Sequence, residues 1–156
     1  QKLNAIVPQS SAVEIQEAIY TNDSKRLQQQ LRKLLLQSAS SFDTVGELFF
    51  HGLFLGICAI FDDQYYVTSN RESGEGRFDI QLMPKNNSRP GVLIELKSKK
   101  DLSKEQLDTL AQEALNQINE RQYDTEMKTH GITTIFRYGA AFSGKNVAIC
   151  SESEMK

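Results

Sequence analysis

The first part of the chain carries apolar residues at the spacing of an α-helix. Apolar positions recur every three or four residues over 10–20 and 23–38, which predicts two amphipathic helices. The first helix opens with Ser11 and Glu14, which have the spacing of a capping box. A third segment, residues 44–61, is apolar nearly all round, so we expect it to be the most buried helix.

The pattern then changes to that of β-strands. Residues 64–69, 77–83 and 91–97 are rich in aromatic and β-branched residues or alternate apolar with polar positions, which predicts three strands. Residues 132–142 and 146–150 predict two more strands, joined by a short turn.

A further helix is predicted between these two groups of strands. Residues 101–122 carry one apolar stripe at helical spacing, and Ser103 and Gln106 form a capping box before it. The order is therefore helices, three strands, a helix and two strands. This order is typical of an α/β fold in which helices flank a mixed sheet.

The hairpin formed by residues 77–97 places charged residues inside two otherwise apolar strands. Pairing the two apolar rows fixes which side chains share a face. A turn centred on Asn87 places Asp79 directly opposite Glu95, where like charges are destabilising unless a cation lies between them. A slip by two residues instead places Asp79 opposite Lys97 as an ordinary ion pair. The hairpin pattern alone fits both registers.

Two stretches of this hairpin resemble the active-site signature of the PD-(D/E)XK nuclease superfamily. They are Gly76-Arg77-Phe78-Asp79 and Glu95-Leu96-Lys97, although the proline of the signature is replaced by Phe78. More closely, the chain resembles a bacterial branch in which the nuclease-like domain follows an AAA-type ATPase-like domain in one polypeptide. The matching stretches are "GELFFHGLFLGI", "NRESGEGRFDIQLMPK", "VLIELK", "ALNQINERQY" and "YGAAFSGKNVAI".

The resemblance implies a restriction-endonuclease-like αβββαβ core and hydrolysis of phosphodiester bonds that depends on Mg²⁺ or Mn²⁺. The nucleic acid would be DNA rather than RNA. By the same resemblance, Asp79, Glu95 and the backbone carbonyl of Leu96 would hold the metal, and Lys97 would be the catalytic lysine. Glu47 would approach the metal through water.

Further site residues also follow from the resemblance. Gln117 would match the glutamine of the helix after the lysine strand, and Tyr123 would match the aromatic residue that follows it. Arg77 and Lys99 lie in or next to the signature stretches of the hairpin, and together with Tyr123 they would contact a substrate phosphate. Ordinary alternatives remain for three of them: Glu47 could cap its own helix, Gln117 could be a solvated residue at the edge of the stripe, and Arg77 could pair with a neighbouring glutamate.

One further stretch resembles a phosphate-binding motif but lacks two of its required features. Residues 139–146, "GAAFSGKN", nearly match the phosphate-binding P-loop, but Asn146 replaces the hydroxyl that would hold Mg²⁺. A strand pattern follows it, where the P-loop requires a helix. We therefore expect a hairpin turn here.

Composition limits the function classes without choosing between them. The net charge is −2, with 39% hydrophobic and 24% charged residues, which is usual for a globular domain and provides no overall basic field. The lysines nevertheless gather between Lys97 and Lys104. No apolar run is long enough to span a membrane, so we expect a cytoplasmic protein without a membrane partner.

These observations predict a helical segment over 1–43, a nuclease-like core over 44–150 and a tail over 151–156. The expected partners are nucleic acid and an ATPase-like domain N-terminal to this chain. The competing interpretation is a non-catalytic nuclease-like module that docks an ATPase domain or another protein.

Overall fold

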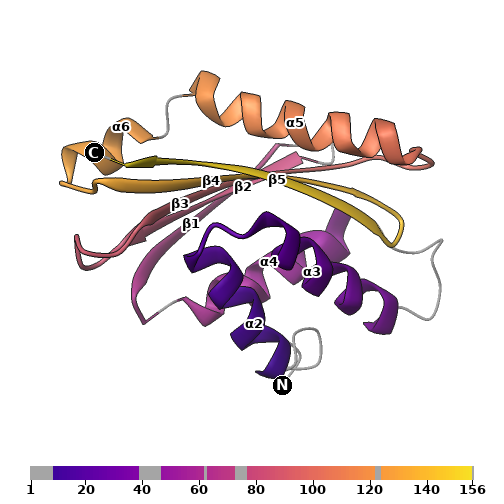
Figure 1. Cartoon of the computed structure of the whole chain (residues 1–156), viewed down its shortest axis with the longest axis horizontal. Helices are drawn as coiled ribbons and strands as arrows, with labels where there is room; N and C mark the ends of the chain where they lie inside the picture. Colours follow the sequence, from indigo (N-terminus) through magenta and orange to yellow (C-terminus); the bar gives the residue numbers. More distant parts are fainter. Residues whose placement is uncertain (1–8, 39–46, 62, 73–76, 122–123, 156) are drawn as a thin grey trace.

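A computed structural model of the chain shows a five-stranded mixed sheet with helices on both faces (Figure 1). The α/β architecture predicted from the sequence is confirmed. The structure describes residues 9–38, 47–61, 63–72, 77–121 and 124–155.

The strands follow one another across the sheet in chain order. Neighbouring strands are antiparallel except β3 and β4, which run parallel because helix α5 (Lys104–Arg121) returns the chain between them. The strands are β1 (Tyr65–Glu72), β2 (Arg77–Pro84), β3 (Gly91–Ser98), β4 (Thr134–Ser143) and β5 (Asn146–Met155).

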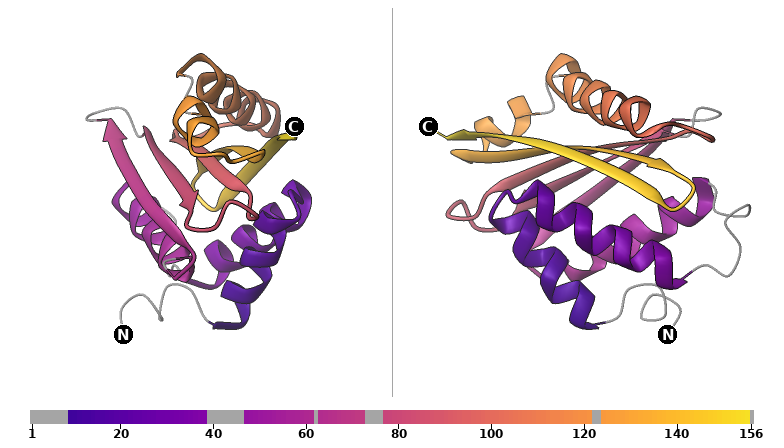
Figure 2. Two further views of the ribbon diagram at one scale, coloured as in Figure 1. Left: turned by 90° about the vertical axis from the view of Figure 1, so that its left-hand side faces the viewer. Right: turned by 45° about the vertical axis from the view of Figure 1, so that its right-hand side comes forward.

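The helices form two layers, one on each face of the sheet (Figure 2). The larger core lies between α2, α3, α4 and the sheet, and its fully buried side chains include Leu31, Tyr138 and Phe142. On the other face, α5 packs against β3, β4 and β5. The helices are α2 (Gln9–Tyr20), α3 (Ser24–Ser38), α4 (Glu47–Ile60), α5 (Lys104–Arg121) and α6 (Asp124–Thr129).

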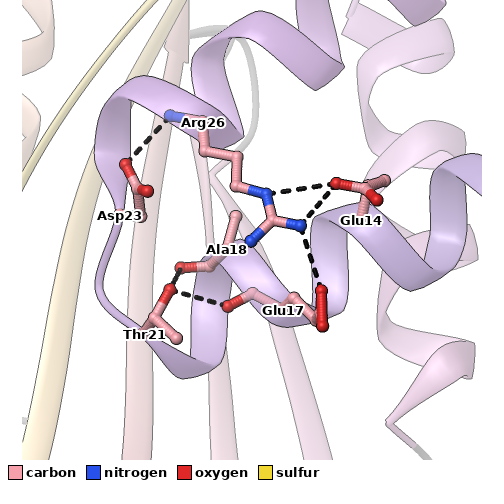
Figure 3. Close-up of polar contacts among 6 residues, drawn as sticks. All are labelled: Glu14, Glu17, Ala18, Thr21, Asp23 and Arg26. Carbon is pink, nitrogen blue, oxygen red and sulfur yellow. Dashed lines mark hydrogen bonds and ion pairs between the residues drawn. The ribbon is translucent and has the colours of Figure 1, made fainter.

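Arg26 joins α3 to α2 at one corner of the helical layer (Figure 3). Its Nη2 lies 2.5 Å from Oε1 of Glu14 and 3.0 Å from Oε2 of Glu17. Its backbone N–H donates to Oδ1 of Asp23, which caps α3. The capping box predicted at Ser11 is wrong, since α2 begins at Gln9 and Glu14 instead pairs with Arg26.

Other local predictions had mixed outcomes. The capping box of α5 is confirmed, because Ser103 and Gln106 exchange backbone-to-side-chain hydrogen bonds of 2.9 and 3.2 Å. The P-loop-like stretch forms the β4–β5 hairpin, with Gly144 at φ 60° in its turn. β5 continues past Cys150 to Met155, through residues that we expected to form a tail. The short helix α6 was not predicted.

Gly139 on β4 allows α5 to approach the sheet closely. A Cβ atom built on Gly139 would lie 2.6 Å from the backbone nitrogen of Leu115 and closer still to the carbonyl oxygen of Ala111. Neither backbone atom can move without moving the helix. Because Gly139 is paired with Glu95 on β3, this close contact places α5 beside the charged centre of the hairpin.

Candidate active site

The β2–β3 hairpin adopts the register that opposes two carboxylates. Asp79 is paired with Glu95, and the apolar pairs Phe78–Leu96 and Ile80–Ile94 lie on either side of it. The slipped register, with Asp79 opposite Lys97, is wrong. Side chains alternate along each strand, so Asp79 and Glu95 point to the face that α5 covers, away from the larger core.

Both carboxylates are almost completely buried. Asp79 is 3% exposed and Glu95 is 0% exposed. Burying a charge is costly unless it is paired or coordinated, so two opposed acids here call for nearby cations. Arg77 provides one such cation, since its Nη2 lies 3.7 Å from Oε2 of Glu95.

Arg77 and Lys97 form a second opposed pair of like charges, one step along the same face from the two acids. The Nε and Nη2 atoms of Arg77 are buried and have no hydrogen-bond partner among the residues that the structure describes. These donors face the same part of the sheet as Glu95. Arg77 therefore offsets the charge of Glu95, as in a structural ion pair. Its N–H groups could also donate hydrogen bonds to a phosphate oxygen.

Lys97 is half-buried at the end of β3, and its pKa lies below the ordinary value of a lysine. Burial contributes most to this lowering, and the positive charge of Arg77 adds to it. The carboxylates of Glu113 and Glu95 act in the opposite direction, and Lys99 again lowers the pKa. The ammonium group of Lys97 thus lies near both positive and negative side chains, on the same face as the two buried acids.

Asn70 on β1 is a site residue that the sequence analysis missed. It is paired with Asp79, and its Nδ2 donates a hydrogen bond of 3.2 Å to Oδ1 of Asp79. The predicted strand ended at residue 69, so the alternation that places Asn70 on the carboxylate face was not followed far enough. An amide that engages one carboxylate oxygen fixes the orientation of the other.

The remaining predicted residues are only partly placed. Gln117 lies on α5, and its Oε1 is buried without a hydrogen-bond partner among the described residues. Leu96 buries its side chain in the larger core, on the face opposite to its neighbours in the signature. Glu47 is the first residue of α4, but its side chain lies outside the described part of the chain, as does the whole of Tyr123.

A cavity of about 370 Å³ lies beside the end of β3 and the first half of α5. Lys99, which directly follows β3, and Glu113, whose charge acts on Lys97, both line it. Its lining residues are Lys99, Leu102, Glu105, Gln106, Thr109, Leu110 and Glu113. A cavity lined by both acidic and basic side chains therefore lies next to the carboxylate face of the hairpin.

The donor set of the hairpin fits a hard divalent ion. Asp79 and Glu95 offer carboxylate oxygens, and residues 77–97 contain no histidine or cysteine. Within the described ranges, no group of three or more His, Cys, Asp or Glu residues could by itself hold a metal ion. Mg²⁺ commonly uses one or two carboxylates together with waters and substrate phosphates, so the residues present are compatible with it.

Comparison with known proteins agrees with this geometry. The family model of the PD-(D/E)XK nuclease superfamily matches residues 45–152, which include the whole hairpin and α5. No curated protein matches the sequence. Over the described residues, none of the helices has the length and apolar character needed to cross a membrane.

Proposed function

We propose that this chain, which belongs to the PD-(D/E)XK nuclease superfamily, is a metal-dependent nuclease domain that hydrolyses phosphodiester bonds, with DNA as the preferred substrate. The observation that carries this proposal is the opposition of Asp79 and Glu95, with Lys97 on the same face of β3. Two buried acids and a lysine on one rigid hairpin provide metal ligands and a cation at fixed spacing.

The metal would be Mg²⁺ or Mn²⁺, held by Asp79, Glu95 and the backbone carbonyl of Leu96. Glu47 would support it through water. A bound divalent ion supplies polarisation of the scissile phosphate and lowers the pKa of an attacking water. The buried carboxylates keep their orientation because the strands on both sides pair with the hairpin, and because Asn70 engages Asp79.

Lys97 would orient the attacking water and stabilise the negative charge that develops on the phosphate. Its half-buried position favours this role, because charge interactions strengthen where water is excluded. Gln117 would accept a hydrogen bond through its buried Oε1 from water or substrate. Arg77, Lys99 and Tyr123 would bind substrate phosphates. The acidic net charge does not oppose this, since substrate meets the local field of these cations.

The test is cleavage of plasmid and single-stranded DNA, and of RNA, with Mg²⁺ or Mn²⁺. Lys97→Ala should lower the rate by at least 100-fold, since an electrostatic contact to the reacting group commonly contributes about that much. Lys33→Ala is the matched control, because Lys33 is an exposed lysine on α3, on the other side of the sheet. Equal rates for Lys97→Ala and wild type would show that the lysine assignment is wrong.

A second candidate function is a non-catalytic module that docks an ATPase-like domain or another protein. The observation that favours it is the outer surface of the helical layer, where Val13, Leu36 and Leu55 are 51%, 53% and 39% exposed. Each lies on a different helix of that layer. Absence of cleavage for every nucleic acid tested, with wild-type protein that is folded, would favour this function over the nuclease.

A further inference from the structure

The carboxylate face of the sheet continues beyond the area that α5 covers. α5 packs on β3, β4 and β5, whereas β1 lies at the far edge of the sheet, next to β2 (Figure 2). On β1, Tyr66, Thr68 and Asn70 all point to this face, because each pairs with a residue of β2 that shares the face of Asp79. All three are exposed. An open row of side chains therefore leads along the sheet edge to the buried acids.

Tyr66 is the most exposed large apolar side chain of this row. It is 64% exposed, whereas the neighbouring Tyr65, on the opposite face of β1, is 1% exposed and packs in the larger core. Core packing therefore does not explain the aromatic ring at position 66. The Nζ of Lys85 lies 5.1 Å from the centroid of the Tyr66 ring, so the exposed ring has a positive charge beside it.

The distance from this pair to the acids suits a bound polynucleotide. Tyr66 precedes Asn70 by four residues on one strand, which corresponds to about 13 Å at the usual rise of a β-strand. Asn70 in turn contacts Asp79. Between them lie Thr68 and its partner Gln81, whose polar side chains lie on the same face. A strand whose scissile phosphate lies at Asp79 would therefore reach Tyr66 within a few nucleotides.

We propose that Tyr66 and Lys85 form a binding subsite for one unpaired nucleotide of the nucleic-acid substrate. The base stacks on the exposed ring of Tyr66, and the ammonium group of Lys85 neutralises the adjoining phosphate. An aromatic ring beside a cation is the usual combination by which proteins bind single strands without reading their sequence. In a duplex the base faces are already stacked on one another, so this subsite selects single-stranded or frayed nucleic acid. The inference rests on the proposed nuclease function and specifies its substrate.

The experiment measures binding without cleavage. Fluorescence anisotropy of a labelled oligothymidylate is recorded in EDTA, together with a blunt duplex of the same length. Tyr66→Ala should weaken binding of the single strand by roughly 5- to 150-fold, which is the range for loss of one base stack. Tyr66→Phe should keep most of the affinity, because it retains the ring. Binding of the duplex should change less than threefold in both variants.

Two further variants separate stacking from charge and from general effects. Lys85→Gln should reduce the slope of log K against log salt by about 0.7, as expected for one lost phosphate contact on a single strand. Val13→Ala is the matched control, because Val13 is an exposed apolar residue on α2, in the helical layer on the other face of the sheet. It should leave binding unchanged. Urea unfolding of each variant confirms that the comparison is made between folded proteins.

The outcomes distinguish this inference from the proposed function. If wild type binds the single strand and Tyr66→Ala binds it equally well, the subsite is wrong while the nuclease proposal stands. Equal losses for single strand and duplex would also overturn it, since stacking on an unpaired base predicts a difference. If wild-type protein binds neither nucleic acid, both the subsite and the nuclease function fail.

Discussion

Asp79 and Glu95 lie directly opposite each other on β2 and β3, and both are almost completely buried. Like charges in this position repel, so the metal-free protein stores unfavourable energy that a bound cation would relieve. Arg77 lies 3.7 Å from Glu95 and offsets part of this negative charge. Arg77 is itself paired with another cation, Lys97, across the two strands. We therefore expect the stability of the hairpin to depend on whether a cation is bound between Asp79 and Glu95.

The first prediction concerns Glu95→Gln, which keeps the side-chain shape and removes one of the two opposed charges. In EDTA, the free energy of unfolding should stay the same or rise by up to about 1 kcal/mol, the scale of one cross-strand pair. Millimolar Mn²⁺ should raise the melting temperature of wild type through preferential binding to the folded state, but not that of the variant. Urea unfolding and thermal melts, each with EDTA and with Mn²⁺, measure both effects.

Glu126→Gln provides the control for this change, because Glu126 is an exposed glutamate on α6, outside the hairpin. It should leave the response to Mn²⁺ intact. A Glu95→Gln protein that loses stability in EDTA and still gains from Mn²⁺ would contradict the assignment of Glu95 as a metal ligand.

The second prediction concerns Asn70, which donates to Oδ1 of Asp79. Asn70→Ala frees that carboxylate to rotate, so the affinity for Mn²⁺ should fall by about 10-fold, as is typical when a residue that orients a ligand is removed. Titration calorimetry with Mn²⁺ measures the affinity directly. Thr68→Ala changes the preceding residue on the same face of β1 and should bind Mn²⁺ like wild type. Equal affinities for all three proteins would show that Asn70 has no positioning role.

The sequence predicted the two strands of the hairpin and the faces of their side chains, but it left the register open. Alternation fixes which side chains share a face, but a slip by two residues preserves the faces, so the hairpin alone could not exclude Asp79 opposite Lys97. The structure has the register in which Ile80 pairs with Ile94, and both side chains pack in the larger core.

The misses have equally local causes. Helix α6 was missed because Met127 is its one buried side chain, which leaves no apolar stripe to detect. Asn70 was missed because a polar residue near the end of an edge strand resembles the start of a loop in the sequence. Its role depends on the partner strand, which the local pattern does not show.

The third prediction concerns the acid stability of a charge cluster that ties α6 to β4 and β5. Arg137 is buried on β4 and donates to Asp124 at 2.9 Å and to Glu154 at 2.8 Å. Lys128 contacts the same two acids at 3.0 and 2.7 Å. Burial raises the pKa of Asp124, but the hydrogen bond and charge of Lys128, with the charge of Arg137, outweigh it, so the net pKa is lowered.

The pKa of Glu154 is also lowered, first by its hydrogen bond with Lys128 and then by that with Arg137. Because both acids titrate lower in the folded state, their contribution to stability is present above their ordinary values of 3.8 and 4.5 and is lost as the pH falls below them. In Lys128→Met, the free energy of unfolding should fall less steeply between pH 5 and 2, measured by urea unfolding. Lys33→Met should keep the wild-type slope, and an unchanged slope in Lys128→Met would refute the assigned coupling.

The last prediction concerns Gly139, which lets α5 approach the sheet beside Glu95. In Gly139→Ala the new methyl group would meet backbone atoms of Ala111 and Leu115 at distances that real side chains do not adopt. Either α5 or β4 must shift, so the free energy of unfolding should fall by about 1–3 kcal/mol, as for other overpacked positions. Since the shift occurs next to the carboxylate pair, the affinity for Mn²⁺ should fall as well.

Gly52→Ala is the matched control for this change. A Cβ atom at Gly52, within helix α4, would meet no atom of the described residues within 4 Å. Replacing a helical glycine with alanine should therefore raise the free energy of unfolding by about 0.5–1 kcal/mol and leave Mn²⁺ binding unchanged. Chemical denaturation compares the stability of the two variants, and Mn²⁺ titration compares their metal affinity. If Gly139→Ala were as stable as Gly52→Ala, the close contact between α5 and β4 could not be what positions the helix.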